Sequence, residues 1–187
     1  MKHSNATYIA QTRYWLENVV IKHNLCPFAQ KPFKGGQIRY VVTDSARPEF
    51  LLEDLQHELE HLRATPASEV ETTLLIHPGA LEDFYDYNDF LDIVDALLEQ
   101  EGYAGEFQVA SFHPDYQFAE TRPEDAENYT NRSPYPMLHL IREDSLEQAI
   151  AHYPDVDDIP ERNIDTMNRL GSAHHQQVLA DSFKQFA

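Results

Sequence analysis

The sequence predicts a single α/β domain with a mixed, mostly parallel sheet of about four strands flanked by helices. Three observations support this class. The 187-residue chain has the size of one domain with one core. Short runs of β-forming residues alternate with longer segments whose apolar residues recur at helical spacing. The segments between the first three runs are long enough to carry crossover helices, which favours parallel strands.

The first half of the chain is expected to form two helices and two strands. Apolar residues at helical spacing between Tyr8 and Val20 predict the first helix. Alternating side chains over 38–43 predict the first strand. Pro48 is expected to open a second helix that buries a row of leucines, and the β-forming run 72–76 predicts the second strand.

The second half continues the alternation and then departs from it. A third helix is expected over about 88–102, and strands over 107–112 and 137–141. Between these two strands lies a long irregular stretch, 114–136. Because it shows no crossover helix, we favour a fourth strand antiparallel to the third, although the sequence leaves both directions open.

The C-terminal part is expected to be helical. Capping-box spacings at 144–147 and 158–161 predict two helices, the second ending at Gly171. We therefore place the single domain at 1–171 and expect a polar, partly helical tail at 172–187.

Charge and composition exclude several classes of partner. The net charge of −18 repels phosphate backbones, so no nucleic acid and no anionic membrane is expected, although a local basic pocket could bind a small anion. No apolar run approaches the roughly 20 residues that span a bilayer, and no signal-peptide pattern is visible. The single cysteine, Cys26, allows no internal disulfide and is expected to be a packing residue. These features predict a cytoplasmic protein.

Chemistry-bearing residues gather where the predicted strands end. Asp44 ends the first strand, the next two end in His-Pro pairs at His77 and His113, and Asp115 follows. Ligands of open α/β sheets bind at this carboxyl edge. His77, His113 and Asp115 could therefore hold a divalent metal such as zinc, with His139 as a fourth ligand. The alternative is that each His-Pro pair only ends its strand, with the imidazole hydrogen-bonded to loop carbonyls.

The stretch 114–136 is a second candidate element. It is rich in tyrosine and proline, so we expect it to be ordered and to fold back over the strand edge that carries His113. Its side chains Asn128, Asn131 and Arg132 would make a cradle for a carboxylate or phosphate group. The alternative is that the same side chains pin the loop to its own domain.

Two classes of function follow from these residues. In the first, a small-molecule enzyme, hydrolase-like and with or without a metal, uses His113 as general base or metal ligand. Asp115 and His139 would assist it, and Arg132 would hold an anionic substrate. The second class is a non-catalytic ligand-binding or regulatory domain. A concave pocket where the histidines converge favours the enzyme, whereas a filled edge with dispersed histidines favours the binding domain.

Five segments carry a resemblance to a known family. They are 25–28, 71–75, 87–91, 108–118 and 128–136, which read LCPF, ETTLL, YNDFL, QVASFHPDYQF and NYTNRSPYP. In these segments the chain resembles the uncharacterised bacterial family DUF1415, over nearly all of its length up to Gly171. The resemblance implies a bacterial cytoplasmic protein. It transfers no catalytic residue, because the family has no established activity.

Overall fold

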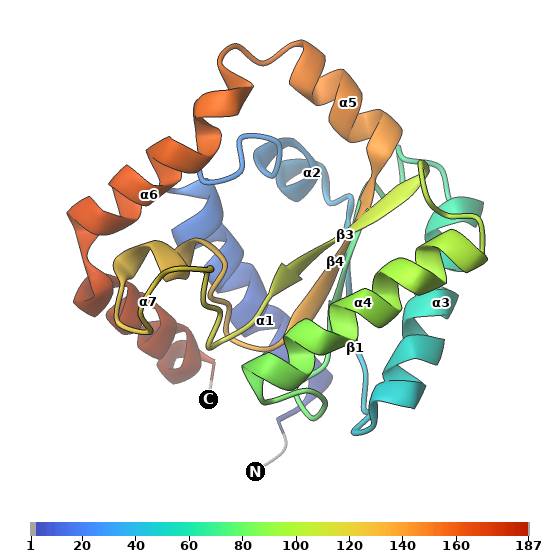
Figure 1. The fold of residues 1–187 in the computed structure, drawn as a ribbon, viewed down its shortest axis with the longest axis horizontal. Helices are drawn as coiled ribbons and strands as arrows, with labels where there is room; N and C mark the ends of the chain where they lie inside the picture. The colour runs from blue at the N-terminus through green and yellow to red at the C-terminus, as the bar shows by residue number, and fades with distance from the viewer. Residues whose placement is uncertain (1–2, 187) are drawn as a thin grey trace.

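The structure, a computed structural model, describes residues 3–186 and contains one four-stranded sheet with helices on both faces (Figure 1). The strand order is β1-β2-β4-β3. β1 pairs in parallel with β2, and β4 is antiparallel to both of its neighbours. The strands are β1 (Ile38–Val42), β2 (Thr72–Ile76), β3 (Phe107–Phe112) and β4 (Met137–Arg142).

The mixed sheet is confirmed, but the expectation that it is mostly parallel is wrong. β1, β2 and β3 all point the same way, as their connections through helices predict. β4, however, lies between β2 and β3 and runs against both, so one of the three neighbouring pairs is parallel. The reason is that the chain from β3 to β4 contains no α-helix and returns to the edge that it left. The preferred antiparallel direction of β4 is thus confirmed.

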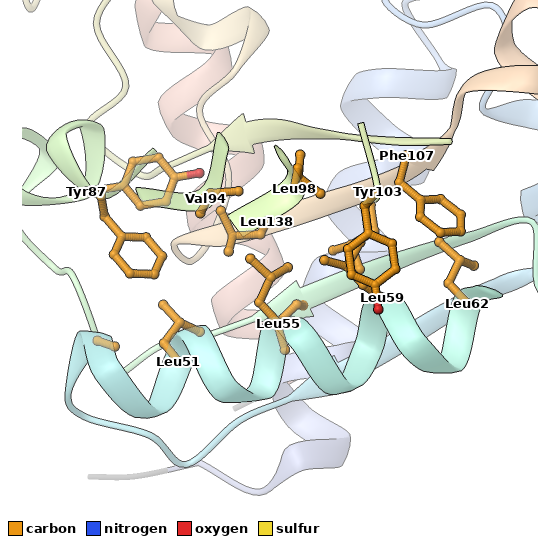
Figure 2. Close-up of a cluster of buried hydrophobic side chains, with 14 residues drawn as sticks. Leu51, Leu55, Leu59, Leu62, Tyr87, Val94, Leu98, Tyr103, Phe107 and Leu138 are labelled. Carbon is orange, nitrogen blue, oxygen red and sulfur yellow. The ribbon is translucent and has the colours of Figure 1, made fainter. Parts of the chain in front are cut away.

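One face of the sheet is covered by α3 (Pro48–Ala64) and α4 (Phe84–Gln100). Figure 2 shows the cluster that they bury with the sheet, in which the leucines of α3 project from one side of the helix. α4 begins earlier than the sequence suggested, because the side chain of Asp83 accepts hydrogen bonds from the N–H groups of its first turn.

The other face is covered by the N-terminal and C-terminal helices. α1 (Asn5–Trp15) continues into the π-helical segment η1 (Leu16–Ile21), and α6 (Ile159–Leu170) and α7 (Ser172–Gln185) complete the layer. Their buried side chains form a second cluster around Trp15. The polar tail expected after Gly171 is mostly α7, which packs against α1.

Four short elements lie outside these layers. They are α2 (Gln30–Gly35), η2 (Ala126–Thr130) within the long β3–β4 loop, α5 (Glu143–Ala151) and η3 (Val156–Asp158). η2 packs against α6 and α7, so the loop lies beneath the C-terminal helices. Within residues 3–186, no helix has the length and apolar character needed to cross a membrane.

Candidate functional site

The carboxyl ends of β1, β2 and β3 meet the amino end of β4 at one edge of the sheet. His77 and His113 lie at this edge, as predicted. The 114–136 loop returns to it: the N–H of His113 donates to the carbonyl of Asn131 at 3.2 Å, and the N–H of His77 donates to the carbonyl of Pro136 at 3.0 Å. The predicted position of the loop over this edge is therefore confirmed.

His113 is fully buried and both of its ring nitrogens are occupied. Nδ1 accepts a hydrogen bond from the N–H of Asp115 at 3.0 Å, so the proton of the neutral ring is on Nε2, which donates to the carbonyl of Leu81 at 3.1 Å. The ring packs against Phe84 and Tyr87, and burial lowers its pKa. His113 could bind a metal or accept a proton only by losing one of these hydrogen bonds.

His77 has a similar structural role. Its Nδ1 donates to the carbonyl of Ala80 at 2.9 Å, and its ring stacks on Tyr87. Nε2 is buried and has no hydrogen-bond partner among residues 3–186. Burial lowers the pKa of the ring to about 4, so the imidazole is neutral at pH 7. Both imidazoles thus hydrogen-bond to carbonyls of the turn that follows β2, which is the alternative that the sequence left open.

The third histidine, His139, lies on the opposite face of the sheet. It is paired in register with Leu74 and Ala110, and Leu74 belongs to the cluster around Trp15. Its Nε2 lies 2.8 Å from the hydroxyl oxygen of Thr72, and burial lowers its pKa to about 4. His139 therefore does not join His77 and His113 in one site.

The metal site receives no support from these positions. Asp115 is an exposed residue beside His113, and it approaches the ring through its backbone N–H. In the described part of the chain, no three His, Cys, Asp or Glu side chains are arranged to hold a metal ion. The structure brings His77, His113 and Asp115 to one edge without making a ligand set of them.

The predicted anion cradle is occupied by its own loop. Arg132 donates from Nε to the carbonyl of Tyr116 at 3.0 Å and from Nη2 to that of Pro123 at 2.7 Å, and its guanidinium lies over the ring of Tyr129. Asn131 donates from Nδ2 to the carbonyl of Ser111 at 3.1 Å.

Asn128 is also fully engaged. Its Oδ1 accepts from the N–H of Phe118 at 2.9 Å and from the hydroxyl of Thr121 at 2.8 Å, and its Nδ2 donates to the carbonyl of Arg122 at 2.7 Å. Together with Asn131 and Arg132, it ties the loop to itself and to β3. The alternative that these side chains pin the loop to its own domain accounts for the contacts of all three.

Replacing Arg132 with alanine should destabilise the protein by about 1–3 kcal/mol, because two loop carbonyls lose charged donors. Urea unfolding measures it. The matched control is Arg47→Ala, since Arg47 forms an exposed ion pair with Glu49, lies over the exposed ring of Phe50 and should contribute less than 1 kcal/mol. Equal stability of the two variants would contradict the structural role of Arg132.

Cys26 fits its expected packing role. It is half-buried, belongs to the margin of the cluster around Trp15, and burial raises the pKa of its thiol. A raised pKa disfavours the reactive thiolate at neutral pH.

The same sheet edge carries a hollow that the sequence did not predict. It has a volume of about 310 Å³ and lies between the end of β1 and α3. We call it the β1–α3 hollow. Its lining residues are Val41, Val42, Thr43, Asp44, Asp54, His57 and Glu58. The sequence signal was available: the last three recur at helical spacing of three and four residues, so they share one side of α3.

Two carboxylates of the β1–α3 hollow are held in fixed positions. Asp54 accepts hydrogen bonds from the hydroxyls of Thr43 and Ser45. Glu58 forms a two-point ion pair with Arg39, at 2.7 and 3.0 Å. These contacts tie α3 to β1 and to the residues that follow it, and Arg39 balances the charge of Glu58.

A second hollow, of about 370 Å³, lies between α1, α2 and the end of α7. It contains Arg13, whose guanidinium lies 5.3 Å from the centres of the rings of Phe33 and Tyr40. This hollow lies over the face of the sheet that α1 covers.

Comparison with known proteins identifies the family and nothing more. No curated protein matches the chain, and no solved structure matches it. The family model described as a protein of unknown function (DUF1415) matches residues 7–177, which extends the resemblance past Gly171 into α7. The chain therefore belongs to the DUF1415 family.

Proposed function

We propose that this protein is a non-catalytic binding domain and that the β1–α3 hollow is its ligand site. The observation that carries the proposal is that the strand edge is filled around His77 and His113 by their own buried rings, while the β1–α3 hollow lies at the same edge. His113 uses both ring nitrogens in hydrogen bonds to the backbone, and His139 lies on the other face of the sheet. By the criterion set from the sequence, dispersed histidines in a filled edge favour a binding domain over the hydrolase-like enzyme.

The charge of the hollow favours a cationic ligand. Asp54 is held there by hydrogen bonds, Arg39 balances the charge of Glu58, and the whole chain carries a net charge of −18. Such a field raises the local concentration of cations and slows the approach of anions. The anionic ligand expected from Arg132 lacks this support, because the Nε and Nη2 groups of Arg132 already bind loop carbonyls.

The test uses a short lysine peptide as cationic probe. Asp54→Asn should weaken its binding at least fivefold by calorimetry. Asp92→Asn, on the exposed side of α4, removes the same charge away from the hollow and should change the affinity less than twofold. Equal losses in both variants would show that the peptide senses only net charge, and the proposal would fail.

A second measurement on the unaltered protein guards against loss of folding in the Asp54 variant. Addition of the peptide should shift the backbone amide signals of residues 41–44 in a nitrogen–proton NMR spectrum. Shifts centred on the 114–136 loop instead would place the ligand at the strand edge of His113 and overturn the assignment.

A further inference from the structure

The backbone of β1 has one side bonded to β2 and one side free for a partner. The N–H of Thr43 donates to the carbonyl of Ile76 at 3.0 Å, and the N–H of Thr72 lies 3.5 Å from the carbonyl of Gln37. In a parallel ladder, alternate residues bond to the neighbouring strand. Thr43 and Gln37 fix this alternation, so the amide groups of Ile38, Tyr40 and Val42 point away from β2.

These outward groups have no hydrogen-bond partner in the described part of the chain. Apart from the strand ladder, no hydrogen bond within residues 3–186 involves the backbone of Ile38, Tyr40 or Val42. An open strand edge is a template for pairing with another chain, and proteins ordinarily protect such edges. β1 therefore offers backbone donors and acceptors at the edge of the sheet.

The other edge of the sheet is hydrogen-bonded at its two ends. The N–H of Glu143 donates to the carbonyl of Glu106 at 3.0 Å, so the even-numbered residues of β3 bond to β4. The backbone N–H and carbonyl groups of the odd-numbered residues therefore point away from β4. At its start, the N–H of Phe107 donates to the carbonyl of Tyr103 at 2.9 Å. At its end, the carbonyl of Ser111 accepts from the side chain of Asn131. β1 differs in that no outward backbone group of Ile38, Tyr40 or Val42 has such a partner within residues 3–186.

The β1–α3 hollow lies beside β1, on the side of the strand that has no partner strand. Side chains on one face of an added strand would recur about every 7 Å, since a strand rises about 3.3 Å per residue. Of the two α3 carboxylates in the hollow, Glu58 is 8% exposed and both of its oxygens bind Arg39, so Asp54 is the one that an added side chain can reach. A basic side chain on the α3-facing side of an extended segment would therefore pair with Asp54.

We propose that an extended segment of a partner protein, with a lysine or arginine that faces Asp54, adds to the sheet as a strand beside β1. This inference rests on the proposed function and names its ligand class. In strand addition, backbone hydrogen bonds give affinity and alternate side chains give specificity. Here the side chains that face α3 would give the specificity. A second copy of this chain is a poor occupant, because two chains of charge −18 would bring their α3 carboxylates together.

Two peptides of identical charge test strand addition. The first alternates lysine and valine over six residues, and the second has the same sequence with alternate backbone nitrogens methylated. The unmethylated peptide should bind at least tenfold more tightly, because methylation removes the donors that would pair with β1. Equal binding of both would keep the cation site and overturn strand addition, whereas no binding of either would overturn both proposals.

The protein side offers a matched pair of variants. Val42→Pro removes an outward N–H that has no ladder partner, so the sheet should tolerate it at this edge while peptide affinity falls at least tenfold. Val42→Ala keeps the N–H and should bind within twofold of the unaltered protein. Circular dichroism verifies the fold, and if Val42→Pro does not fold, the methylated peptide decides. A concentration-dependent dimer in sedimentation, abolished by the proline, would assign the edge to a second copy and refute the proposal.

Discussion

Replacing Tyr87 with phenylalanine should lower the free energy of unfolding by roughly 2–5 kcal/mol, because two buried backbone groups lose their partner. Tyr87 is fully buried at one end of the cluster in Figure 2. Its hydroxyl donates to the carbonyl of Met137 at 2.8 Å and accepts from the N–H of Phe112 at 3.1 Å. Phe112 and Met137 are partners in the register of β3 and β4, so the hydroxyl bridges the last rung of this ladder.

Urea unfolding measures the effect, and Tyr85→Phe is its control. Tyr85 is in the same helix turn but is 73% exposed, so the loss of its hydroxyl should change stability by less than about 0.5 kcal/mol. A cost below about 1 kcal/mol for Tyr87→Phe would mean that the N–H of Phe112 and the carbonyl of Met137 bond to each other without the hydroxyl. The bridging role would then be refuted.

Acidification from pH 7 to pH 4 should strongly lower the free energy of unfolding, because buried histidines must take up protons. Burial lowers the pKa of His77 and of His175 to about 4, and both rings are almost completely buried. The unfolded chain binds these protons near pH 6.5, so stability is full above that pH and is lost as the pH falls toward 4. Each ring contributes about 3 kcal/mol to this loss, against a total stability of roughly 5–15 kcal/mol.

The contribution of one ring can be isolated. His77→Asn keeps a donor for the carbonyl of Ala80 and removes the titrating ring. Between pH 6.5 and 4, the free energy of unfolding of this variant should therefore fall less steeply with pH, and the slope should correspond to close to one fewer proton taken up on unfolding. His61→Asn, at an exposed position on α3, is the control and should leave the slope unchanged. An unchanged slope for His77→Asn would show that another group causes the acid sensitivity.

Local patterns predicted most of the elements, because burial imposes a period on the residues that share a face. The leucines of α3 and the β-forming run of β2 are examples: the first recur at helical spacing and the second are buried throughout. The short helix α2 was missed, since six residues that include Pro32 and Gly35 carry no period. The polar tail proved mostly helical because it packs through a few buried residues such as His175 and Ser182.

The arrangement of the site depended on information that is not local. Which face His139 occupies follows from its register against Leu74 and Ala110, and a shift of one residue would reverse it. The roles of His77 and His113 follow from carbonyls of a turn whose conformation no motif specified. The β1–α3 hollow was missed because Asp54 and Glu58 read as the solvated side of a helix until β1 is placed beside them.

The central place of β4 determines when this protein can finish folding. β4 is the last strand in the chain, yet it lies between β2 and β3 and supplies the only bridge that joins these two within the sheet of residues 3–186. During synthesis, β2 therefore waits with one unpaired edge until the ribosome has released the chain beyond Arg142. Contacts between strands so distant in sequence slow folding and lengthen the exposure of unpaired edges. The sheet is therefore completed by its central strand. A nascent chain that stops before β4 can pair β1 with β2 but leaves β3 without a partner strand.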